Sequence, residues 1–167
     1  SDSLALIFYE RSTEDFKEGG NEWRYAQSLL NISYHLIKLK LFTSADSLLQ
    51  TAYTYQLDSN YQARYYETCG LYYYAQQQYD SALVYFNQGL DCWQSESDKL
   101  YTYLKMMQVY IDIYALDTAL PYAQLIIENS SNPNYLVNAY YCLMQDAKNR
   151  DDAQLLSKYS HAREDAN

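Results

Sequence analysis

The sequence contains few of the residues that loops, disulfide frameworks and metal sites require. Its 167 residues include four glycines, two prolines, three cysteines and two histidines. Because glycine and proline are so rare, little of the chain can be loop. The odd cysteine count excludes a full disulfide framework, and the cysteines show no Cys-x-x-Cys or Cys/His spacing. We therefore expect no metal ion and no cofactor.

Positive charge and long apolar runs are also scarce. Twelve Lys and Arg stand against 21 Asp and Glu, and the net charge of −9 argues against a nucleic-acid partner. No apolar run approaches the roughly 18 to 20 residues needed to span a bilayer, so we expect no membrane span in this segment. Tyrosine is abundant instead, with 22 residues. Because tyrosine packs like phenylalanine and keeps a polar tip, we expect most of these side chains to pack and the remainder to line a binding face.

The stretch from Ala63 to Gln94 has the pattern of two amphipathic helices that fold back on each other. Aromatic and small residues recur three to four positions apart in each half. Gly70 and Ala82 are small enough to let two backbones approach closely, and Asp80 is expected to be the N-cap of the second helix. The positions that carry the pattern are Tyr66, Gly70, Tyr73, Tyr79, Ala82, Phe86 and Gly89.

This pattern resembles the tetratricopeptide repeat (TPR), a helix–turn–helix unit of about 34 residues. Gln94 stands where that family often has proline. The resemblance implies an all-α fold, a right-handed superhelical solenoid of antiparallel helix pairs with about 4.5 repeats and roughly nine helices. The small residue that opens each second helix recurs at separations of 40, 37, 37 and 34, which indicates a repeat array; these residues are Ala5, Ala45, Ala82, Ala119 and Ala153.

The whole chain is predicted to be a single repeat domain. It comprises a half repeat over residues 1–20 and four repeats near 22–58, 59–95, 96–131 and 132–165. Helices are expected near 3–17, 22–39, 43–57, 60–76, 79–93, 97–114, 117–129, 133–148 and 151–164. The sequence starts inside a repeat and without an initiating methionine, so we expect a fragment of a longer protein. The apolar side of the half repeat, at Leu4, Ile7 and Phe8, is a candidate contact for a homodimer.

The sequence offers little catalytic chemistry. No glycine-rich phosphate loop is present, and neither histidine has a predictable nucleophile beside it. His35 is followed three residues later by Lys38, which over this short span resembles helical phosphotransfer domains, although Leu39 stands where they prefer a small residue. We expect a non-enzyme and keep phosphotransfer as the least favoured alternative.

A partner-binding face follows from the TPR resemblance. In that family the first helices of successive hairpins line the concave surface, which binds a peptide or protein segment. Leu30 and Tyr34 occupy positions where a carboxylate clamp needs Lys and Asn, so no such clamp is expected. Whether Leu30, Leu71, Leu104 and Ile111 bind a partner or pack between helices stays open. The candidate partner-binding residues are Gln27, Asn31, Tyr34, Lys38, Arg64, Glu67, Tyr74, Tyr101, Gln108, Asp112, Asn138 and Gln145.

Besides phosphotransfer, two non-catalytic interpretations of the role remain open. Tyrosine-rich repeats with DSAL or DTAL openings resemble the repeat arrays of bacterial membrane-anchored transcriptional regulators, whose sensing repeats lie outside the membrane. That resemblance implies an extracytoplasmic, periplasmic sensor or scaffold that binds a protein or peptide. The alternative is a binder of a small molecule or glycan, which a closed pocket between Tyr34, Tyr74 and Tyr101 would favour.

Overall fold

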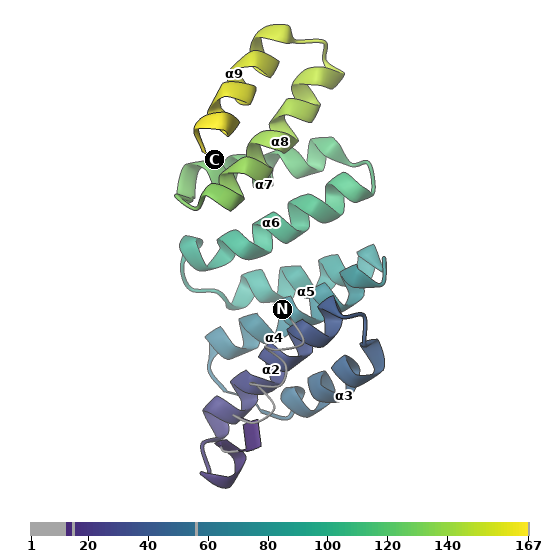
Figure 1. Ribbon diagram of the computed structural model, residues 1–167, viewed down its shortest axis with the longest axis vertical. Coiled ribbons are helices and arrows are strands. Elements are labelled where there is room, and N and C mark those ends of the chain that lie inside the picture. Colours follow the sequence, from purple (N-terminus) through teal and green to yellow (C-terminus); the bar gives the residue numbers. More distant parts are fainter. Residues whose placement is uncertain (1–12, 15, 56, 167) are drawn as a thin grey trace. The chain divides into compact units, whose positions relative to one another are not determined.

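The computed structural model describes residues 13–14, 16–55 and 57–166. In this part of the chain the structure is all-α and has no strand (Figure 1); eight helices have defined bounds, and residues 13–14 and 16–18 are also helical. The predicted helix over 3–17 lies largely outside the described residues, and Ala5 and the candidate dimer contact at Leu4, Ile7 and Phe8 lie wholly outside them. The helices are α2 (Glu22–Lys38), α3 (Phe42–Tyr53), α4 (Ser59–Ala75), α5 (Tyr79–Cys92), α6 (Glu96–Asp112), α7 (Leu116–Asn129), α8 (Pro133–Asn149) and α9 (Ala153–Asp165).

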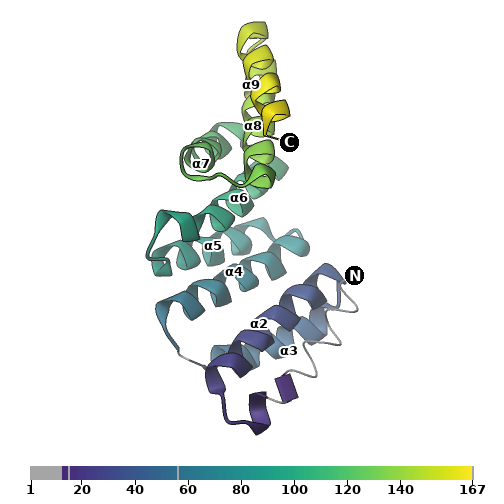
Figure 2. The ribbon, with the colours of Figure 1, turned by 60° about the vertical axis from the view of Figure 1, so that its left-hand side comes forward.

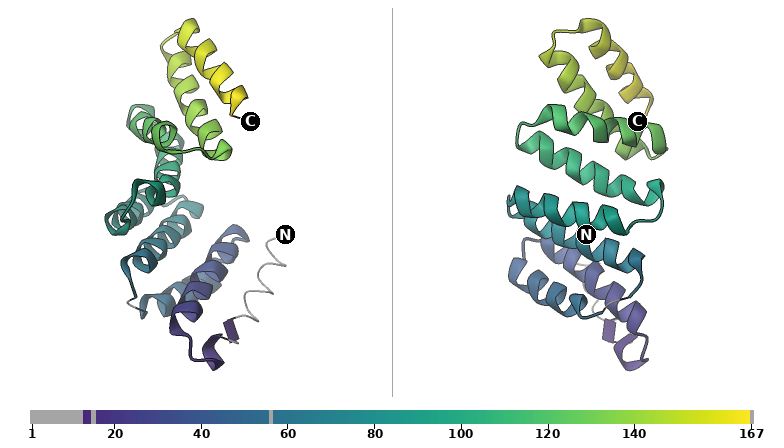
Figure 3. Two further views of the ribbon diagram at one scale, coloured as in Figure 1. Left: turned by 90° about the vertical axis from the view of Figure 1, so that its left-hand side faces the viewer. Right: turned by 180° about the vertical axis from the view of Figure 1, so that it is seen from behind.

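The chain divides into two compact units, Ser1–Trp93 and Gln94–Asn167. In the first unit α2 packs on α3 and α4, and α4 packs on α5. In the second unit α6 packs on α7 and α8, and α8 packs on α9. Figures 2 and 3 show consecutive helices of each pair running antiparallel within each unit. The predicted limits of the individual repeats stay a prediction.

The predicted helix boundaries agree with the structure to within two residues for seven of the eight described helices. The helix predicted over 43–57 is the exception, because α3 ends at Tyr53. The amides of Thr54 and Tyr55 donate to the carbonyls of Thr51 and Ala52, which tightens and closes the last turn. Tyr55 and Leu57 then fold back against the buried cluster that contains Leu49 and Tyr61.

The first helix of each pair starts at a polar N-cap that recurs every 37 residues. Each cap side chain accepts a hydrogen bond from a backbone amide two or three residues later, which satisfies an otherwise unpaired N–H group. Pro133 follows the Asn132 cap at the first helical position, where proline's missing N–H group would have no partner in the helix. The caps are Asn21, Asp58, Ser95 and Asn132.

The turn inside each pair also recurs every 37 residues. A residue with φ between 55° and 61° follows each first helix, at Lys40, Gln77, Tyr114 and Asp151. At the first of these turns the Lys40 amide donates to the Ile37 carbonyl and the Leu41 amide to the Leu36 carbonyl, and the other three turns repeat both bonds. This pair of bonds defines a Schellman motif. The chain therefore reverses direction between the two helices of each pair through backbone hydrogen bonds, without a particular side chain in the turn.

The residue after each left-handed position is the N-cap of the second helix. It is Gln78 in α5, so the predicted cap at Asp80 is wrong. Asp80 lies in the first turn of α5 instead, where its carboxylate favours the positive end of the helix dipole.

The 37-residue frame corrects one sequence match. Ala45, Ala82 and Ala119 each lie five residues after a left-handed residue and are fully buried. The equivalent position in the last pair is Leu156, whereas Ala153 is the exposed first residue of α9. The 34-residue separation was therefore a false match, and the described repeats keep a constant length.

The predicted close approach of α4 and α5 occurs at Gly70. A Cβ atom there would lie 2.5 Å from Cδ1 and Cε1 of Phe86, so the buried phenylalanine ring occupies the space next to the glycine. Thirty-seven residues further on, Met107 and Ala123 hold these two positions, and both are buried. The bulky side chain thus comes from the second helix in one pair and from the first helix in the other.

Candidate partner-binding site

In the first unit, α2 and α4 are the first helices of consecutive helix pairs. We call the surface that these two helices form the first-helix face. Asn31, Tyr34 and Lys38 lie on α2, and Arg64 and Tyr74 lie on α4. The exposed Arg64 donates from Nη2 to Asn31 Oδ1 over 3.1 Å. This bond joins two predicted residues that are 33 positions apart and orients the guanidinium group of Arg64.

A second cation, Lys38, lies further along α2. The Lys38 ammonium nitrogen lies 5.5 Å from the centroid of the Tyr34 ring, within the range of a cation–π contact. The Tyr34 ring also meets the His35 ring edge-on at 5.3 Å. The face therefore carries two positive side chains, Lys38 and Arg64, on a chain whose net charge is −9.

Two predicted residues are buried and do not belong to this surface. Gln27 is 8% exposed and Glu67 is 9% exposed. The Glu67 carboxylate accepts a 3.0 Å hydrogen bond from Trp93 Nε1, so it has a packing role at the end of the first unit. Leu30 and Leu104 are also buried, so these two side chains pack between helices and are not available to a partner.

In the second unit the predicted residues gather on α6 and α8. Tyr101 and Gln108 are joined by Lys105, whose Nζ lies 5.3 Å from the Tyr101 ring centroid and donates to Gln108 Oε1 over 3.1 Å. Burial lowers the pKa of Lys105. Sequence reasoning missed Lys105, although its spacing of four residues from Tyr101 and three from Gln108 places it on the same helix face.

The remaining predicted residues of the second unit differ in exposure. Asp112 is exposed at the end of α6, whereas Asn138 and Gln145 are half-buried on α8. The Asn138 amide donates to the carbonyl of Asn134 within its own helix. Tyr101 belongs to the second unit, while Tyr34 and Tyr74 belong to the first.

An aromatic series that was not predicted as a site runs through the first unit. Successive ring centroids lie between 5.1 and 6.4 Å apart, and the series takes rings from α3, α4 and α5. Twin tyrosines at 65–66 and 72–73 are its signal in the sequence. In order of contact, its members are Tyr53, Tyr65, Tyr66, Tyr85, Tyr73, Tyr72 and Phe42.

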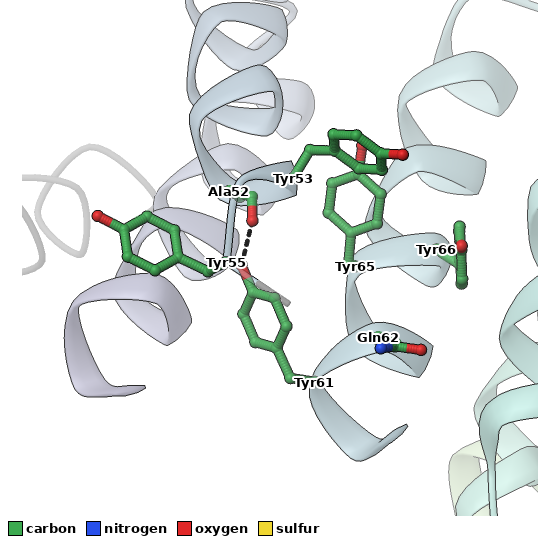
Figure 4. Close-up of a pocket in the computed structure, with 7 residues that line it drawn as sticks. All are labelled: Ala52, Tyr53, Tyr55, Tyr61, Gln62, Tyr65 and Tyr66. Atoms are coloured by element: carbon green, nitrogen blue, oxygen red, sulfur yellow. Dashed lines mark hydrogen bonds between the residues drawn. The ribbon is translucent and has the colours of Figure 1, made fainter. Parts of the chain in front are cut away.

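Two adjoining pockets open along this series. One, of about 410 Å³, includes Tyr85 and Gln88 in its lining. The other, of about 210 Å³, includes Tyr61 and Gln62 in its lining and is drawn in Figure 4. Both are lined by the three residues Tyr53, Tyr65 and Tyr66, which we call the shared tyrosines.

Three titratable groups beside the pockets have raised pKa values. Burial raises the pKa of Tyr65, and it raises the pKa of Tyr85 to about 12. Burial also raises the pKa of the Cys69 thiol to about 12, so this buried cysteine is not a thiolate nucleophile.

The structure adds no support for phosphotransfer chemistry. His35 is half-buried, and α2 pairs with α3 and α4 in succession instead of closing a four-helix bundle. Within the described residues, no group of three or more His, Cys, Asp or Glu side chains is placed to hold a metal ion. In the same part of the chain, none of the helices has the length and apolar character that crossing a membrane requires.

The fold has a counterpart among solved structures. The chain is similar to a structure named "MamA MSR-1 C2", a TPR-like protein, with a TM-score of 0.62 and 11% sequence identity. The match covers 98% of this chain and 99% of the other. It shows that this chain has the fold of a TPR-type helical repeat solenoid. In sequence, no protein-family model and no curated protein matches the chain.

Proposed function

We propose that this chain is a non-catalytic, protein-binding TPR-type module. It binds an extended segment of a partner protein on the first-helix face of α2 and α4, and that segment carries an acidic side chain opposite Arg64. The observation that carries the proposal is the exposed Arg64 held by Asn31 across the two helices. A preoriented guanidinium loses little freedom when a carboxylate binds it in bidentate geometry.

The neighbouring side chains suit the same ligand. Tyr34 and Tyr74 are half-buried, so each offers part of an apolar ring as well as a hydroxyl group. Lys38 adds a second positive charge beside Tyr34. Together they fit a segment that has an apolar anchor next to an acidic residue. The TPR-type fold supports the proposal as an analogy of fold.

A displayed library of random peptides tests the proposal, because it samples acidic and non-acidic segments alike. We expect peptides selected on the immobilised chain to share an acidic residue. For a selected peptide, Arg64→Ala should raise the Kd by about one to two orders of magnitude, because a charge-assisted hydrogen bond is lost. Fluorescence polarisation measures the Kd, and far-UV circular dichroism checks that helicity is unchanged.

The matched control is Arg150→Ala. Arg150 is an exposed arginine that is bonded to Asp146 at the end of α8. The Arg150→Ala substitution should leave the Kd of the selected peptide unchanged. An equal Kd for wild type and Arg64→Ala would contradict the proposed site.

The second unit makes a separate contribution in this proposal. Tyr101, Lys105 and Gln108 form a connected polar and aromatic row on α6. This row binds a separate segment of the partner, so Tyr101→Ala should weaken selected peptides whose binding does not depend on Arg64 and should leave the Kd of the Arg64-dependent peptides unchanged.

We further propose that the chain is the sensing array of a larger regulatory protein that is held at a membrane, with the repeats on the extracytoplasmic side. The tyrosine-rich DSAL and DTAL pattern supports this role. Reading the coding sequence on both sides tests it. A signal or lipid-attachment segment upstream, with a transmembrane helix and a DNA-binding or kinase domain downstream, is the expected result. An open reading frame with neither would contradict it.

A further inference from the structure

The two pockets along the shared tyrosines form one recess on the first unit. Tyr53 comes from the end of α3, and Tyr65 and Tyr66 come from α4, so the recess lies between consecutive helix pairs. Figure 4 shows the Tyr53 and Tyr65 rings meeting from these two helices, with Gln62 nearby on α4. We call this recess the tyrosine cleft.

The repeat itself separates packing tyrosines from the others. Tyr66, Tyr73 and Tyr85 recur 37 residues later as Tyr103, Tyr110 and Tyr122, and the ring contacts recur with them. The Tyr73 and Tyr85 rings stack at 5.1 Å and 9°, and the Tyr110 and Tyr122 rings stack at 5.7 Å and 14°. A triplet that two units build in the same way is part of helix packing.

Other residues of the tyrosine cleft do not recur. One repeat after Tyr53, Tyr65 and Gln88 the sequence has Leu90, Thr102 and Leu125; two repeats after them it has Ile127, Ala139 and Ala162. Aliphatic and small residues therefore satisfy the packing at these positions. Tyr53 is also 60% exposed, which is unusual for so large a ring. Tyr53 and Tyr65 are therefore rings that the repeat does not require, whereas Tyr66 and Tyr85 in the same cleft belong to the packing triplet.

The chemistry of the lining selects a class of ligand. Tyrosine rings offer flat apolar faces and hydroxyl groups that donate and accept, and the amides of Gln62 and Gln88 add further donors and acceptors. Among the described residues, no charged side chain lines either pocket, so ionic ligands gain nothing there. Sugar rings combine a face of C–H groups with hydroxyls around the edge, and both parts match this lining.

The shape favours a ring over an extended chain. Ala52 and Tyr61 line the smaller pocket and not the larger one, and the Tyr61 hydroxyl donates to the Ala52 carbonyl over 2.7 Å. An extended proline-rich segment spans several residues along a groove. A recess of about 210 Å³ that joins a wider pocket of about 410 Å³ instead suits one ring held at the end of an oligosaccharide.

We infer that the tyrosine cleft binds a neutral oligosaccharide. A terminal sugar ring enters the smaller pocket beside Gln62, and the next ring lies on Tyr53 and Tyr65 toward Gln88. This inference is independent of the proposed function, because Arg64 and Asn31 do not line the cleft.

Isothermal titration calorimetry with defined neutral oligosaccharides tests the inference on the whole chain. The probes are cellohexaose, laminarihexaose, xylohexaose, mannohexaose and chitohexaose, with a deca-proline peptide as the competing ligand. We expect at least one saccharide to bind with a Kd between about 10 μM and 1 mM, a range that a small aromatic cleft supports. Deca-proline should not bind.

Variants locate the binding. Tyr53→Ala and Tyr65→Ala should each raise the Kd at least about tenfold, since each removes a ring face. Tyr53 is exposed, so its loss should leave folding intact even if Tyr65→Ala does not fold. The matched control Tyr141→Ala removes a 44% exposed tyrosine from α8 and should leave the Kd unchanged.

Three results would overturn the inference. They are no heat of binding with any of the five saccharides up to about 10 mM, saccharide binding that Tyr53→Ala leaves unchanged, and binding of deca-proline in place of saccharide. The last result would assign the cleft to a proline-rich segment. Loss of peptide binding in Arg64→Ala would not affect any of these results.

Discussion

The first unit, with α2 to α5, and the second unit, with α6 to α9, use one backbone frame and fill it differently. N-caps and left-handed turn residues recur every 37 residues in both. At the contact between the two helices of a pair, however, the first unit has Gly70 against Phe86, and the second has Met107 and Ala123 in these places. The frame is maintained by hydrogen bonds to the backbone at the caps and turns. The larger side chain at the helix contact, in contrast, comes from the second helix of the pair in the first unit and from the first helix of the pair in the second unit.

This comparison separates what the repeat requires from what it permits. The repeat requires a fixed total volume at the helix contact, because protein interiors are closely packed. It permits rings at Tyr53 and Tyr65, where the second unit has none at the equivalent positions. Exchanging features between the units is therefore the direct way to test the comparison.

The largest effect is expected at the Gly70 and Phe86 contact. Phe86 is fully buried, so Phe86→Ala should lower the free energy of unfolding by about 3–5 kcal/mol through lost burial and a cavity. Adding Gly70→Met transfers the arrangement of the second unit and should recover a substantial part of the loss. Urea denaturation measures each variant.

The control for this exchange is Val84→Ala, an exposed position on the same helix, which should change stability by no more than about 0.5 kcal/mol. If the double variant were as unstable as the sum of its single changes, the two units would not be filling equivalent contacts.

A smaller effect is expected from the hydroxyl that closes α3. Tyr61→Phe removes a 2.7 Å bond to the Ala52 carbonyl, which still accepts from the Tyr55 amide. The cost should be about 1 kcal/mol, as for a single buried hydrogen bond. Tyr135→Phe at the equivalent position of the second unit should cost less, because Tyr135 is half-buried. A thermal melt compares the two variants, and equal losses of stability would show that burial of the tyrosine does not determine the cost of losing its hydroxyl group.

A stabilising change is expected at the turn of the second unit. Tyr114 has φ 60° and is 96% exposed, so its side chain adds strain and little packing. Tyr114→Gly should raise the free energy of unfolding by about 0.5–1 kcal/mol, because glycine adopts this conformation without steric cost. Ala115→Gly, at a φ of −96°, is the control and should not stabilise. A loss of stability in Tyr114→Gly would mean that the tyrosine ring makes a contribution that exceeds its strain.

The smallest effect is a pH dependence that both units share. Burial raises the pKa of Tyr85 in the first unit and of Tyr103 in the second, each to about 12. The unfolded chain therefore ionises first as pH rises through about 10, and stability present below pH 10 is lost between about pH 10 and 12. At pH 10 the loss from each tyrosine should be on the order of a few tenths of a kcal/mol.

Urea titrations at pH 8 and pH 10 measure this loss, and Tyr85→Phe and Tyr103→Phe should each reduce it. An unchanged pH dependence in both variants would exclude these two side chains as its source.

The all-α fold and most helix boundaries follow from the sequence because helical periodicity and polar caps act locally. Asn132 with Pro133 is an example, since a cap and an adjacent proline need no tertiary information. The cap at Gln78 was missed because the preceding Schellman turn, and not the side chain, selects it. Burial of Gln27 and Glu67 was missed because the helix face that each side chain uses depends on how the helix pairs meet.

The tyrosine cleft was also beyond local reasoning. Its rings come from α3, α4 and α5, and no single stripe of the sequence contains Tyr53, Tyr65 and Gln88. A constant 37-residue frame would have exposed it, because only that frame shows which tyrosines recur. The false match at Ala153 concealed the frame in the sequence.

The left-handed turn has a consequence for how such an array changes over generations. Lysine, glutamine, tyrosine and aspartate each occupy it, so the turn places no demand on a particular codon. A gene segment that encodes residues 41–77 starts and ends at the same backbone junction. Duplicating or deleting that segment would leave a Schellman junction where the ends are joined, so the array can gain or lose one whole block in a single genetic event.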